Sequence, residues 1–376
     1  MIYSEPVPAS TPACVLKGPR ELAIEEVPMW PVESYGDPDL VLVKVGAVGV
    51  CGSDFRYYLG ENPWAQHTLG RFVPNPPNIV LGHEYAGTVV AVQRPQDEHL
   101  LGKRVAPVCS KVCGACDDCR NGRTRLCPNT VHMGHGQGWG SQPYYPGAYA
   151  RYALAWASSC FEISDGLSFE AASMMDILAV CVHVAEVGQV QFGRPILTIG
   201  AGPAGNGIAQ IANAMGASGS VLLERSSRAI EVAQTQGIGI AIDSTGRTNA
   251  ELAEELGRHA PSGFGTVFDT VCTPETIDLS LTVLGRAGTL VVLAAHDVAV
   301  PINLLRLGAE RRLVTSCNFE VGDYPKALAL LEAGRVKVSE WQQRIDLRGL
   351  PEAFERVTSD DQKAGVFKMV VDPCHD

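Results

Sequence analysis

The sequence predicts a two-domain α/β protein, in which an antiparallel, β-rich domain comes first and a domain built on a doubly wound parallel sheet follows. Three observations support this prediction. The chain has 376 residues, which is too many for one ordinary core. Short β-like runs separated by turns fill residues 13–50. Beyond residue 196, strand-like runs alternate with helix-like runs, as is typical of a parallel sheet.

Composition and charge exclude several classes of protein. Hydrophobic residues make up 46% and charged residues 19%, which is normal for a globular protein. The net charge of −11 argues against a nucleic-acid-binding surface, which needs clustered Lys and Arg. Residues 1–6 carry no secretion signal, and no apolar run approaches membrane-spanning length. We therefore expect a cytoplasmic protein that binds neither nucleic acid nor membrane.

A Gly-rich segment, I-L-T-I-G-A-G-P-A-G, joins a predicted strand to a predicted helix. Its glycines, Gly200, Gly202 and Gly205, have the G-x-G-x-x-G spacing of dinucleotide-binding turns. The first permits a tight turn, the second lets the backbone approach a pyrophosphate, and the third lets the helix pack on the strand. Free N–H groups at the helix start, near Pro203 and Ala204, would face the anion.

A second apolar run ends in Glu224, about 20 residues beyond the Gly-rich turn. A carboxylate at this place hydrogen-bonds the ribose of NAD and repels the 2′-phosphate of NADP. Arg225 and Arg228 favour the opposite choice, because an arginine in this loop can pair with that phosphate. We assign Glu224 and Arg225 to the cofactor site and expect NAD, with NADP as the open alternative.

A cluster of cysteines with the spacing C-x-x-C-x-x-C-x7-C lies in a polar loop: Cys113, Cys116, Cys119 and Cys127. Four thiols in such a loop cannot all be core residues, whereas tetrahedral zinc would close the loop and leave no position for substrate. Disulfides do not suit the expected cytoplasmic location. Cys109 is left out on spacing alone. We expect a structural zinc here, and the loop has too few basic residues for a DNA-binding zinc ribbon.

Other residues with ligand chemistry lie in two short motifs, C-G-S-D at Cys51 and G-H-E-Y at His83 and Glu84. Thiolate, imidazole and carboxylate are the ligands of zinc sites that keep an open coordination position. Asp176 is the sole carboxylate in the apolar middle of a helix predicted over 169–187. A buried carboxylate needs a partner or a metal, because desolvating its charge is expensive.

These four motifs, in this order, resemble those of the zinc-containing medium-chain alcohol and polyol dehydrogenases, over nearly the whole chain. The Gly-His-Glu sequence is most similar to the sorbitol, threonine and glucose dehydrogenase branches. The resemblance implies a GroES-like catalytic domain over residues 1–177, completed by 317–376, and a Rossmann domain over 178–316. We also expect a homo-oligomer, either a dimer or a tetramer.

The resemblance further implies a catalytic zinc held by Cys51, His83 and a carboxylate. Asp176 lies where the family has Cys or, in its polyol branch, Glu, so its shorter side chain departs from the pattern. Glu84 is the alternative third ligand, and the sequence leaves the choice open.

The expected activity is NAD-dependent oxidation of a secondary alcohol of polyol, sugar or hydroxy amino acid type. Ser53 matches the family's Ser or Thr that carries the hydroxyl proton outward. Arg56 stands where simple alcohol dehydrogenases have a relay histidine; arginine stays protonated, so we expect it to orient a polar substrate instead. Two alternatives stay open: a dehydrogenase of apolar alcohols or aldehydes, and a non-catalytic nucleotide-binding protein of the same fold.

A Gly- and aromatic-rich loop at residues 130–148 contains His132 and His135. Because histidines among glycines in a loop more often face solvent than bind metal, we expect both side chains to be exposed. This loop, or the one at residues 60–78, is expected to cover the substrate pocket.

Overall fold

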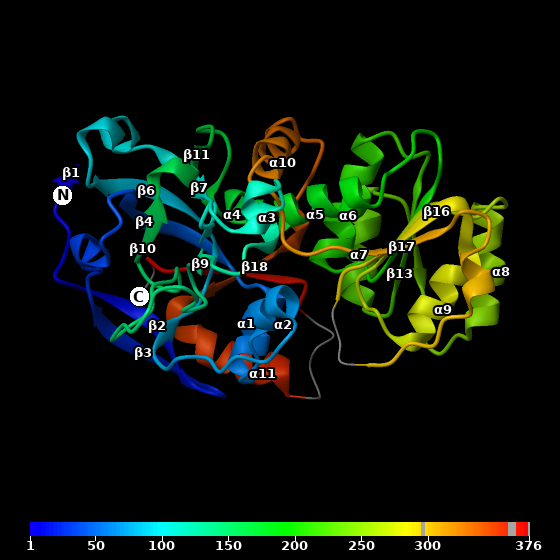
Figure 1. The fold of residues 1–376 in the computed structure, drawn as a ribbon, viewed down its shortest axis with the longest axis horizontal. Helices are drawn as coiled ribbons and strands as arrows, with labels where there is room; N and C mark the ends of the chain where they lie inside the picture. Colours follow the sequence, from blue (N-terminus) through cyan, green and yellow to red (C-terminus); the bar gives the residue numbers. More distant parts are fainter. Residues whose placement is uncertain (295–297, 360–365, 375–376) are drawn as a thin grey trace. The chain divides into compact units, whose positions relative to one another are not determined.

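The computed structural model describes residues 1–294, 298–359 and 366–374. The chain folds into two compact units. The first comprises Met1–Asp176 with Gln342–Asp376, and the second comprises Ile177–Trp341. The first unit therefore contains both the blue and the red ends of the chain in Figure 1.

The largest sheet of the first unit has the strand order β11-β7-β6-β4-β19-β18, with β1 paired to β6 and β10 paired to β4. Its strands are β1 (Ile2–Tyr3), β4 (Leu40–Gly49), β6 (Glu84–Val92), β7 (Arg104–Pro107), β10 (Tyr152–Trp156), β11 (Cys160–Glu162), β18 (Gln342–Asp346) and β19 (Lys368–Asp372). The β18–β19 pair is parallel, and the other pairs are antiparallel. This sheet confirms the predicted antiparallel β-rich domain.

Smaller elements complete the first unit. Its other strands are β2 (Ser10–Gly18), β3 (Glu21–Pro28), β5 (Ile79–Val80), β8 (Ser110–Lys111) and β9 (Val131–His132). Its helices are η1 (Val32–Tyr35), α1 (Gly52–Tyr58), α2 (Pro63–Leu69), η2 (Pro95–Leu100), α3 (Asp117–Arg120), η3 (Thr124–Leu126), η4 (Ala157–Ser159), α4 (Phe169–Ala172), η7 (Leu347–Gly349) and α11 (Leu350–Thr358). The helix α2 lies in the segment 60–78 that the sequence analysis treated as a surface loop.

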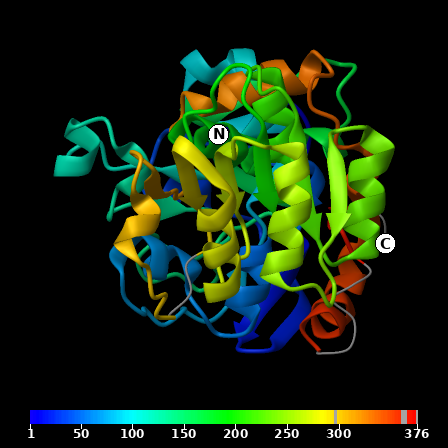
Figure 2. The same ribbon diagram turned by 90° about the vertical axis from the view of Figure 1, so that its right-hand side faces the viewer.

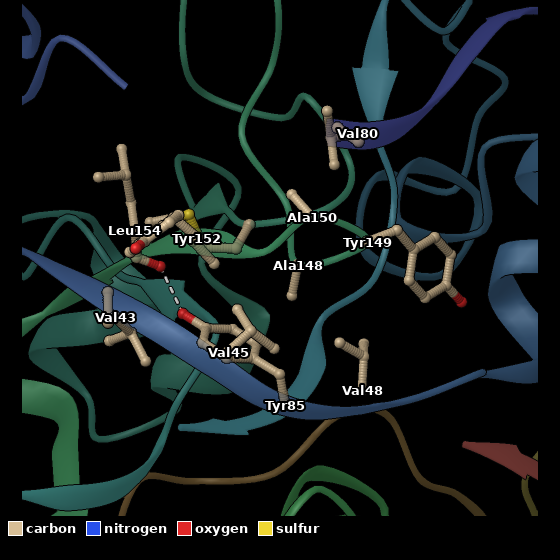
Figure 3. Close-up of a cluster of buried hydrophobic side chains, with 14 of the residues drawn as sticks. Val43, Val45, Val48, Val80, Tyr85, Ala148, Tyr149, Ala150, Tyr152 and Leu154 are labelled. Atoms are coloured by element: carbon tan, nitrogen blue, oxygen red, sulfur yellow. Dashed lines mark hydrogen bonds between the residues drawn. The ribbon is translucent and has the colours of Figure 1, made fainter. Parts of the chain in front are cut away.

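The two central strands, β4 and β6, are buried along most of their length. Val43 and Val45 of β4 pack beside Tyr85 of β6 in a cluster of fully buried side chains (Figure 3). The Tyr85 hydroxyl donates a hydrogen bond to the carbonyl of Leu154, so the polar end of this buried ring is satisfied. The core therefore fixes the register in which β4 and β6 pair.

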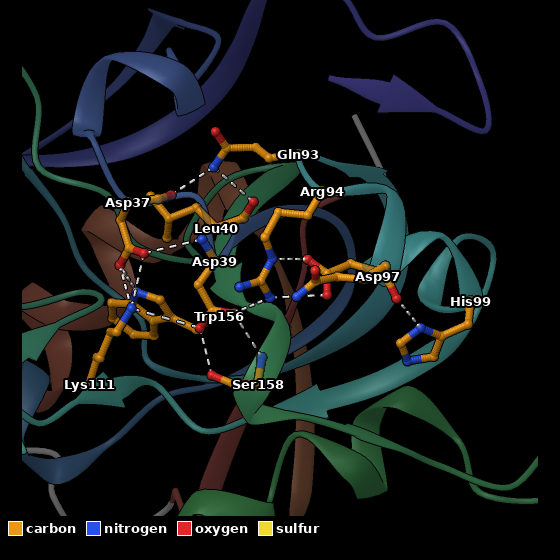
Figure 4. A network of polar contacts seen from close by, with 11 residues as sticks. Asp37, Asp39, Leu40, Gln93, Arg94, Asp97, His99, Lys111, Trp156 and Ser158 are labelled. Atoms are coloured by element: carbon orange, nitrogen blue, oxygen red, sulfur yellow. Dashed lines mark hydrogen bonds and ion pairs between the residues drawn. The ribbon is translucent and has the colours of Figure 1, made fainter.

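A network of charged side chains joins the segments at one end of this sheet (Figure 4). Arg94 donates to the Asp39 carboxylate at 2.7 Å, and Lys111 pairs with Asp37 at 2.7 Å. Burial alone would raise the pKa of Asp37, but the hydrogen bond and charge of Lys111 outweigh it and lower the pKa below its ordinary value. Because Lys111 lies two residues before Cys113, the network anchors the start of the four-cysteine loop.

The second unit contains a parallel sheet with the strand order β14-β13-β12-β15-β16-β17. Its strands are β12 (Ile196–Ile199), β13 (Ser220–Glu224), β14 (Ile240–Asp243), β15 (Phe264–Asp269), β16 (Leu284–Val292) and β17 (Arg312–Thr315). Its helices are α5 (Met175–Val187), which begins at the boundary, α6 (Pro203–Ala214), α7 (Ser227–Gln236), α8 (Asn249–His259), α9 (Pro274–Val283), η5 (Leu304–Leu307), α10 (Asp323–Glu332) and η6 (Ser339–Trp341).

The strand order reverses between β12 and β15, as in a doubly wound fold. Figure 1 shows α6 on one face of this sheet and α8 and α9 on the other, and Figure 2 shows the helices flanking the strands from a second direction. The predicted fold class is confirmed. Among the described helices, none combines the length and apolarity needed to cross a membrane.

The structure corrects one domain boundary. Residues 317–341 belong to the second unit, whereas the sequence analysis assigned them to the first. The Asp323 carboxylate of α10 bonds His183 Nδ1 of α5 at 3.0 Å, and Trp341 Nε1 donates to Asn206 Oδ1 at 3.1 Å. These buried polar contacts hold residues 317–341 on the helices of the second unit. The other boundary falls between residues 176 and 177.

The prediction of a single helix over residues 169–187 was also wrong, because the structure has two helices there. Helix α4 ends at Ala172 and α5 begins at Met175. The Phe169 ring of α4 fills the space over Gly46 of β4, where a Cβ atom would collide with the ring. Packing on β4 therefore sets the direction of α4, and the chain turns before α5 starts.

Candidate functional site

The donor atoms of Cys51, His83 and Glu84 all lie within 4.8 Å of one another. Cys51 follows the end of β4, and His83 and Glu84 lie at the start of β6. The antiparallel register pairs Gly49 with Glu84, so these two strand ends are neighbours. His83 is 4% exposed and Glu84 is 1% exposed. The pairing of two strands thus assembles the thiol, imidazole and carboxylate that the sequence predicted as metal ligands.

The residues present fit a divalent metal such as zinc. Glu84 Oε1 is buried and accepts no hydrogen bond from the described residues, so it has a free lone pair for a cation. The mixture of one sulfur, one nitrogen and one oxygen donor is typical of zinc sites with an open position.

Asp54, in helix α1, supports this cluster, and the sequence analysis did not single it out. Its fully buried carboxylate accepts hydrogen bonds from the Cys51 backbone N–H at 2.9 Å and from the Tyr149 hydroxyl at 2.7 Å. Its Oδ1 lies 3.4 Å from His83 Nδ1. Burial alone would lower the pKa of His83, but the Asp54 carboxylate and Cys51 raise it well above its ordinary value. Metal binding at His83 must therefore displace a proton.

Lys368 of β19 is a second residue that the sequence analysis missed. Its ammonium group pairs with the Glu84 carboxylate, and its side chain is 5% exposed. Burial alone would lower the pKa of Lys368, but Glu84 outweighs it and raises the pKa above its ordinary value. The lysine thus stays charged, and it competes with a metal for Glu84. A lone Lys within the apolar run 366–371 was the available signal.

Asp176, at the start of α5, stands outside the cluster of Cys51, His83 and Glu84 donor atoms. The pKa of Asp176 is raised to about 6, mainly by burial; His83 and Lys368 oppose this shift and Glu84 adds to it. This carboxylate therefore lies in the electrostatic field of the cluster without a strong cationic partner, which is a setting that favours a bound cation.

The two polar residues of α1 expected to act on substrate have different surroundings. The Ser53 hydroxyl oxygen is buried and has no hydrogen-bond partner among the described residues. The Arg56 guanidinium pairs with Glu61 at 2.7 Å and donates to Gln66. Arg56 is therefore held by neighbours within residues 61–66 rather than free to reach outward.

The loop at residues 130–148 differs from its prediction. His135 is 7% exposed and His132 is partly buried, so the expectation that both face solvent was wrong. Trp139 of the same loop stacks on Trp156 at 5.9 Å. Glycine-rich composition indicated exposed histidines, but aromatic and histidine rings pack this segment against the β-rich core.

The four-cysteine cluster assembles as the spacing predicted. The donor atoms of Cys113, Cys116, Cys119 and Cys127 lie within 4.8 Å of one another. Backbone N–H groups of Ala115 and Cys116 lower the pKa of the Cys113 thiol to about 6, which favours a thiolate ligand. Cys109 is buried elsewhere, with its sulfur against the His83 carbonyl, so leaving it out of the quartet agrees with its position.

The Gly-rich turn lies between β12 and α6. Gly200 has φ +88°, which favours glycine, and a Cβ atom on Gly205 would collide with the Gly200 carbonyl oxygen. Gly202 is the N-cap of α6, and the space beside its Cα is open. Pro203 and Ala204 form the first turn of the helix, whose free N–H groups can bind an anion.

Glu224 ends β13, and its carboxylate bonds the turn directly. Oε2 accepts the Ala201 N–H at 2.7 Å, and Oε1 accepts the Arg225 N–H at 2.7 Å and the Ser226 N–H at 3.0 Å. The Arg225 side chain is exposed, while Arg228 pairs with Glu231 at 2.8 Å. The carboxylate is thus positioned beside the turn, as the fingerprint predicts.

Two family models match most of the chain. The alcohol dehydrogenase GroES-like domain matches residues 37–165, and the zinc-binding dehydrogenase domain matches residues 203–333. An L-threonine 3-dehydrogenase of Escherichia coli O139:H28 is 32% identical over 252 residues, covering 64% of this chain and 69% of that protein. The chain belongs to the zinc-dependent medium-chain alcohol and polyol dehydrogenase family. It is therefore an oxidoreductase of that family.

One further relative and two solved structures are similar to nearly the whole chain. The sorbitol dehydrogenase of Bacillus subtilis (strain 168) is 28% identical and covers 93% of this chain and 94% of that protein. A crystal structure of an Escherichia coli oxidoreductase of unknown specificity has a TM-score of 0.83 at 25% identity, covering 96% of this chain and 99% of that one. An Escherichia coli CFT073 dehydrogenase complexed with NADH has a TM-score of 0.82 at 22% identity, covering 97% and 100%, and shows the shared fold.

The four-cysteine cluster predicts one zinc per chain of this dehydrogenase. Replacing Cys116 with Ser should release about one zinc equivalent and lower the temperature of unfolding, because one of four tetrahedral ligands is lost. Cys374→Ser, at an exposed thiol outside the cluster, is the matched control and should retain the metal. Metal analysis of both variants checks this, and an unchanged zinc content in Cys116→Ser would contradict the assignment.

Substitutions can distinguish Asp176 from Glu84 as the third ligand of the catalytic zinc. If Asp176 is the resting third ligand beside Cys51 and His83, Asp176→Asn should lose the catalytic zinc, while Glu84→Gln should retain it.

Zinc content and retained activity decide between these ligands. Loss of zinc in Glu84→Gln alone would move the third ligand to Glu84. Equal loss in both variants would mean that each carboxylate serves at some stage.

Proposed function

We propose that this dehydrogenase oxidises a secondary alcohol of polyol, sugar or hydroxy amino acid type and passes the hydride to NAD. The observation that carries the proposal is the buried cluster of Cys51, His83 and Glu84 donor atoms. The names of the relatives support the substrate class: sorbitol dehydrogenase, probable D-xylulose reductase A and L-threonine 3-dehydrogenase.

The catalytic metal would be held by Cys51, His83 and either Asp176 or Glu84, and zinc bound there supplies a Lewis acid that lowers the pKa of an alcohol oxygen. Ser53 Oγ, buried and without a partner among the described residues, is suited to accept a hydrogen bond from the substrate hydroxyl. Asp54 holds the backbone of Cys51 and lies beside His83, so it orients both ligands. Arg56 would orient a polar substrate only if its bonds to Glu61 and Gln66 were exchanged.

The proposal also covers the number of zinc ions, the oligomeric assembly and the location of the protein. A second, structural zinc in the four-cysteine cluster would make two zinc ions per chain. We also propose a cytoplasmic homo-oligomer with no nucleic-acid or membrane partner. Exposed apolar side chains in the second unit, Leu304 at 78% and Leu305 at 85%, support an assembly that covers them.

A nicotinamide absorbance assay across polyols, sugars, threonine and simple apolar alcohols tests the activity. We expect the highest kcat/KM among the polar substrates, with loss of turnover after chelation and in Cys51→Ser, and full turnover in the control Cys374→Ser. A clear preference for apolar alcohols would favour the alternative dehydrogenase. Binding of NAD without turnover of any alcohol would instead indicate a non-catalytic protein.

Cofactor choice gives a further prediction at Glu224. Replacing it with Ser removes the charge that repels a 2′-phosphate, so the use of NADP relative to NAD should rise by roughly tenfold or more, about 1.4 kcal/mol in differential binding. Ser also removes the acceptor for the Ala201 N–H, so the absolute rates with both cofactors should fall.

The ratio of kcat/KM for the two cofactors is the measurement. Asp243→Ser is the matched control, because Asp243 pairs in register with Glu224 on the neighbouring strand and is exposed. A wild-type preference for NADP would overturn the NAD assignment and give the decisive role to Arg225 or Arg228.

A further inference from the structure

Three imidazole rings lie together in the first unit, beside the proposed metal ligands. The His135 ring is 4.5 Å from the His83 ring, and the His132 ring stacks on His135 at 4.0 Å with an interplanar angle of 15°. On its other face, His135 stacks with Tyr57 at 4.5 Å and 26°. His135 is thus held between two rings, which fixes the plane in which its nitrogens lie.

His83 Nδ1 has two neighbouring acceptors, and only one of them has hydrogen-bond geometry. His135 Nε2 lies 3.1 Å away and is hydrogen-bonded to it. Asp54 Oδ1 lies 3.4 Å away but takes part in no hydrogen bond with the described residues. The Asp54 carboxylate instead uses Oδ2, which accepts the Tyr149 hydroxyl. Asp54 therefore acts on His83 through its charge and a longer contact, and His135 makes the shorter, directed bond.

Metal binding at His83 determines which of its two ring nitrogens carries the proton. A neutral histidine that binds a metal through Nε2 carries its one proton on Nδ1. Because His83 Nδ1 faces His135, Nε2 is the nitrogen left for the metal, and the hydrogen bond must run from His83 Nδ1–H to His135 Nε2. The His132 ring lies farther from His83, at 5.7 Å between ring centroids, and its Nδ1 bonds the Met133 carbonyl at 2.7 Å.

We propose that His135 is a positioning residue of the metal centre: its Nε2 accepts the His83 Nδ1 proton and so fixes the tautomer and ring orientation that present His83 Nε2 to the metal. This inference rests on the proposed function, which places a metal at His83. It assigns a role to a loop histidine that the sequence alone suggested was exposed.

The surroundings of His135 agree with the role of a neutral acceptor. The His135 ring is buried between the rings of Tyr57 and His132. Its Nδ1 is buried without a hydrogen-bond partner among the described residues. Leaving this atom unpartnered is unfavourable, so a histidine at this position has a free-energy cost that its other nitrogen can offset. A bond from Nε2 to His83 explains why histidine stands there.

The test compares three variants of the full-length, zinc-loaded protein. His135→Phe keeps an aromatic ring between Tyr57 and His132 but removes the acceptor. His135→Gln offers an amide oxygen near the place of Nε2. His132→Phe is the matched control, because it alters the same stack without touching the hydrogen bond to His83.

The readouts are zinc affinity by chelator competition and the visible spectrum of the cobalt-substituted protein. We expect His135→Phe to weaken the catalytic zinc by roughly 10- to 100-fold and to shift the cobalt d–d bands. His135→Gln and His132→Phe should stay within about threefold of wild type, a margin well below that loss. The cobalt-thiolate bands of the four-cysteine cluster serve as an internal reference for intact folding.

Several outcomes would overturn the inference. These are wild-type affinity in His135→Phe, an equal loss in His132→Phe, or a loss in His135→Gln as large as that in His135→Phe. The wild type could also bind one zinc more than expected, and only His135→Phe could lose it. That result would indicate a metal held by Asp54, His83 and His135, whose donor atoms also lie within 4.8 Å of one another. A wild-type protein with no metal outside the four-cysteine cluster would overturn the proposed function itself, and the inference with it.

Discussion

The antiparallel pairing of β4 with β6 is the constraint on which the candidate metal centre depends. It places the end of one strand, where Cys51 follows, beside the start of the other, where His83 and Glu84 lie. The Glu84 carboxylate fits beside β4 because Gly49 has no side chain; a Cβ atom there would lie 2.9 Å from Met174 Cε and would also collide with the Glu84 carboxylate. A valine at residue 49 would therefore displace a candidate ligand.

The same pairing concentrates charge in a core that is otherwise apolar. Glu84 and Asp54 are buried carboxylates, and each depends on specific partners: Lys368 for the first, and the Tyr149 hydroxyl and Cys51 N–H for the second. Removing one partner of a buried pair leaves an uncompensated charge, which costs about 3–5 kcal/mol. The centre is therefore costly to assemble and sensitive to single substitutions, as polar networks in a low-dielectric interior are.

The predicted groups of residues that the structure brings together are mostly encoded over short distances along the chain. The Gly-rich turn, the four cysteines and the His83–Glu84 pair each lie within one short segment, so spacing alone indicates their chemistry. Lys368 was missed because its partner is remote in sequence and only the strand order joins them. His135 was misjudged because burial depends on which rings cover a loop, and its composition does not reveal that.

The strand order of the first unit has a consequence for synthesis on the ribosome. The second unit is one continuous segment, so it can fold as soon as it has been made, whereas the first unit must wait for β18 and β19. Until β19 pairs with β4, the end of β4 at Val48 and Gly49 stays open on that edge, although β10 already covers residues 40–44, and Glu84 has no ammonium partner. The nascent chain therefore carries an unfinished β-sheet through most of translation, and during that interval it is most exposed to strand-mediated aggregation and most in need of a chaperone.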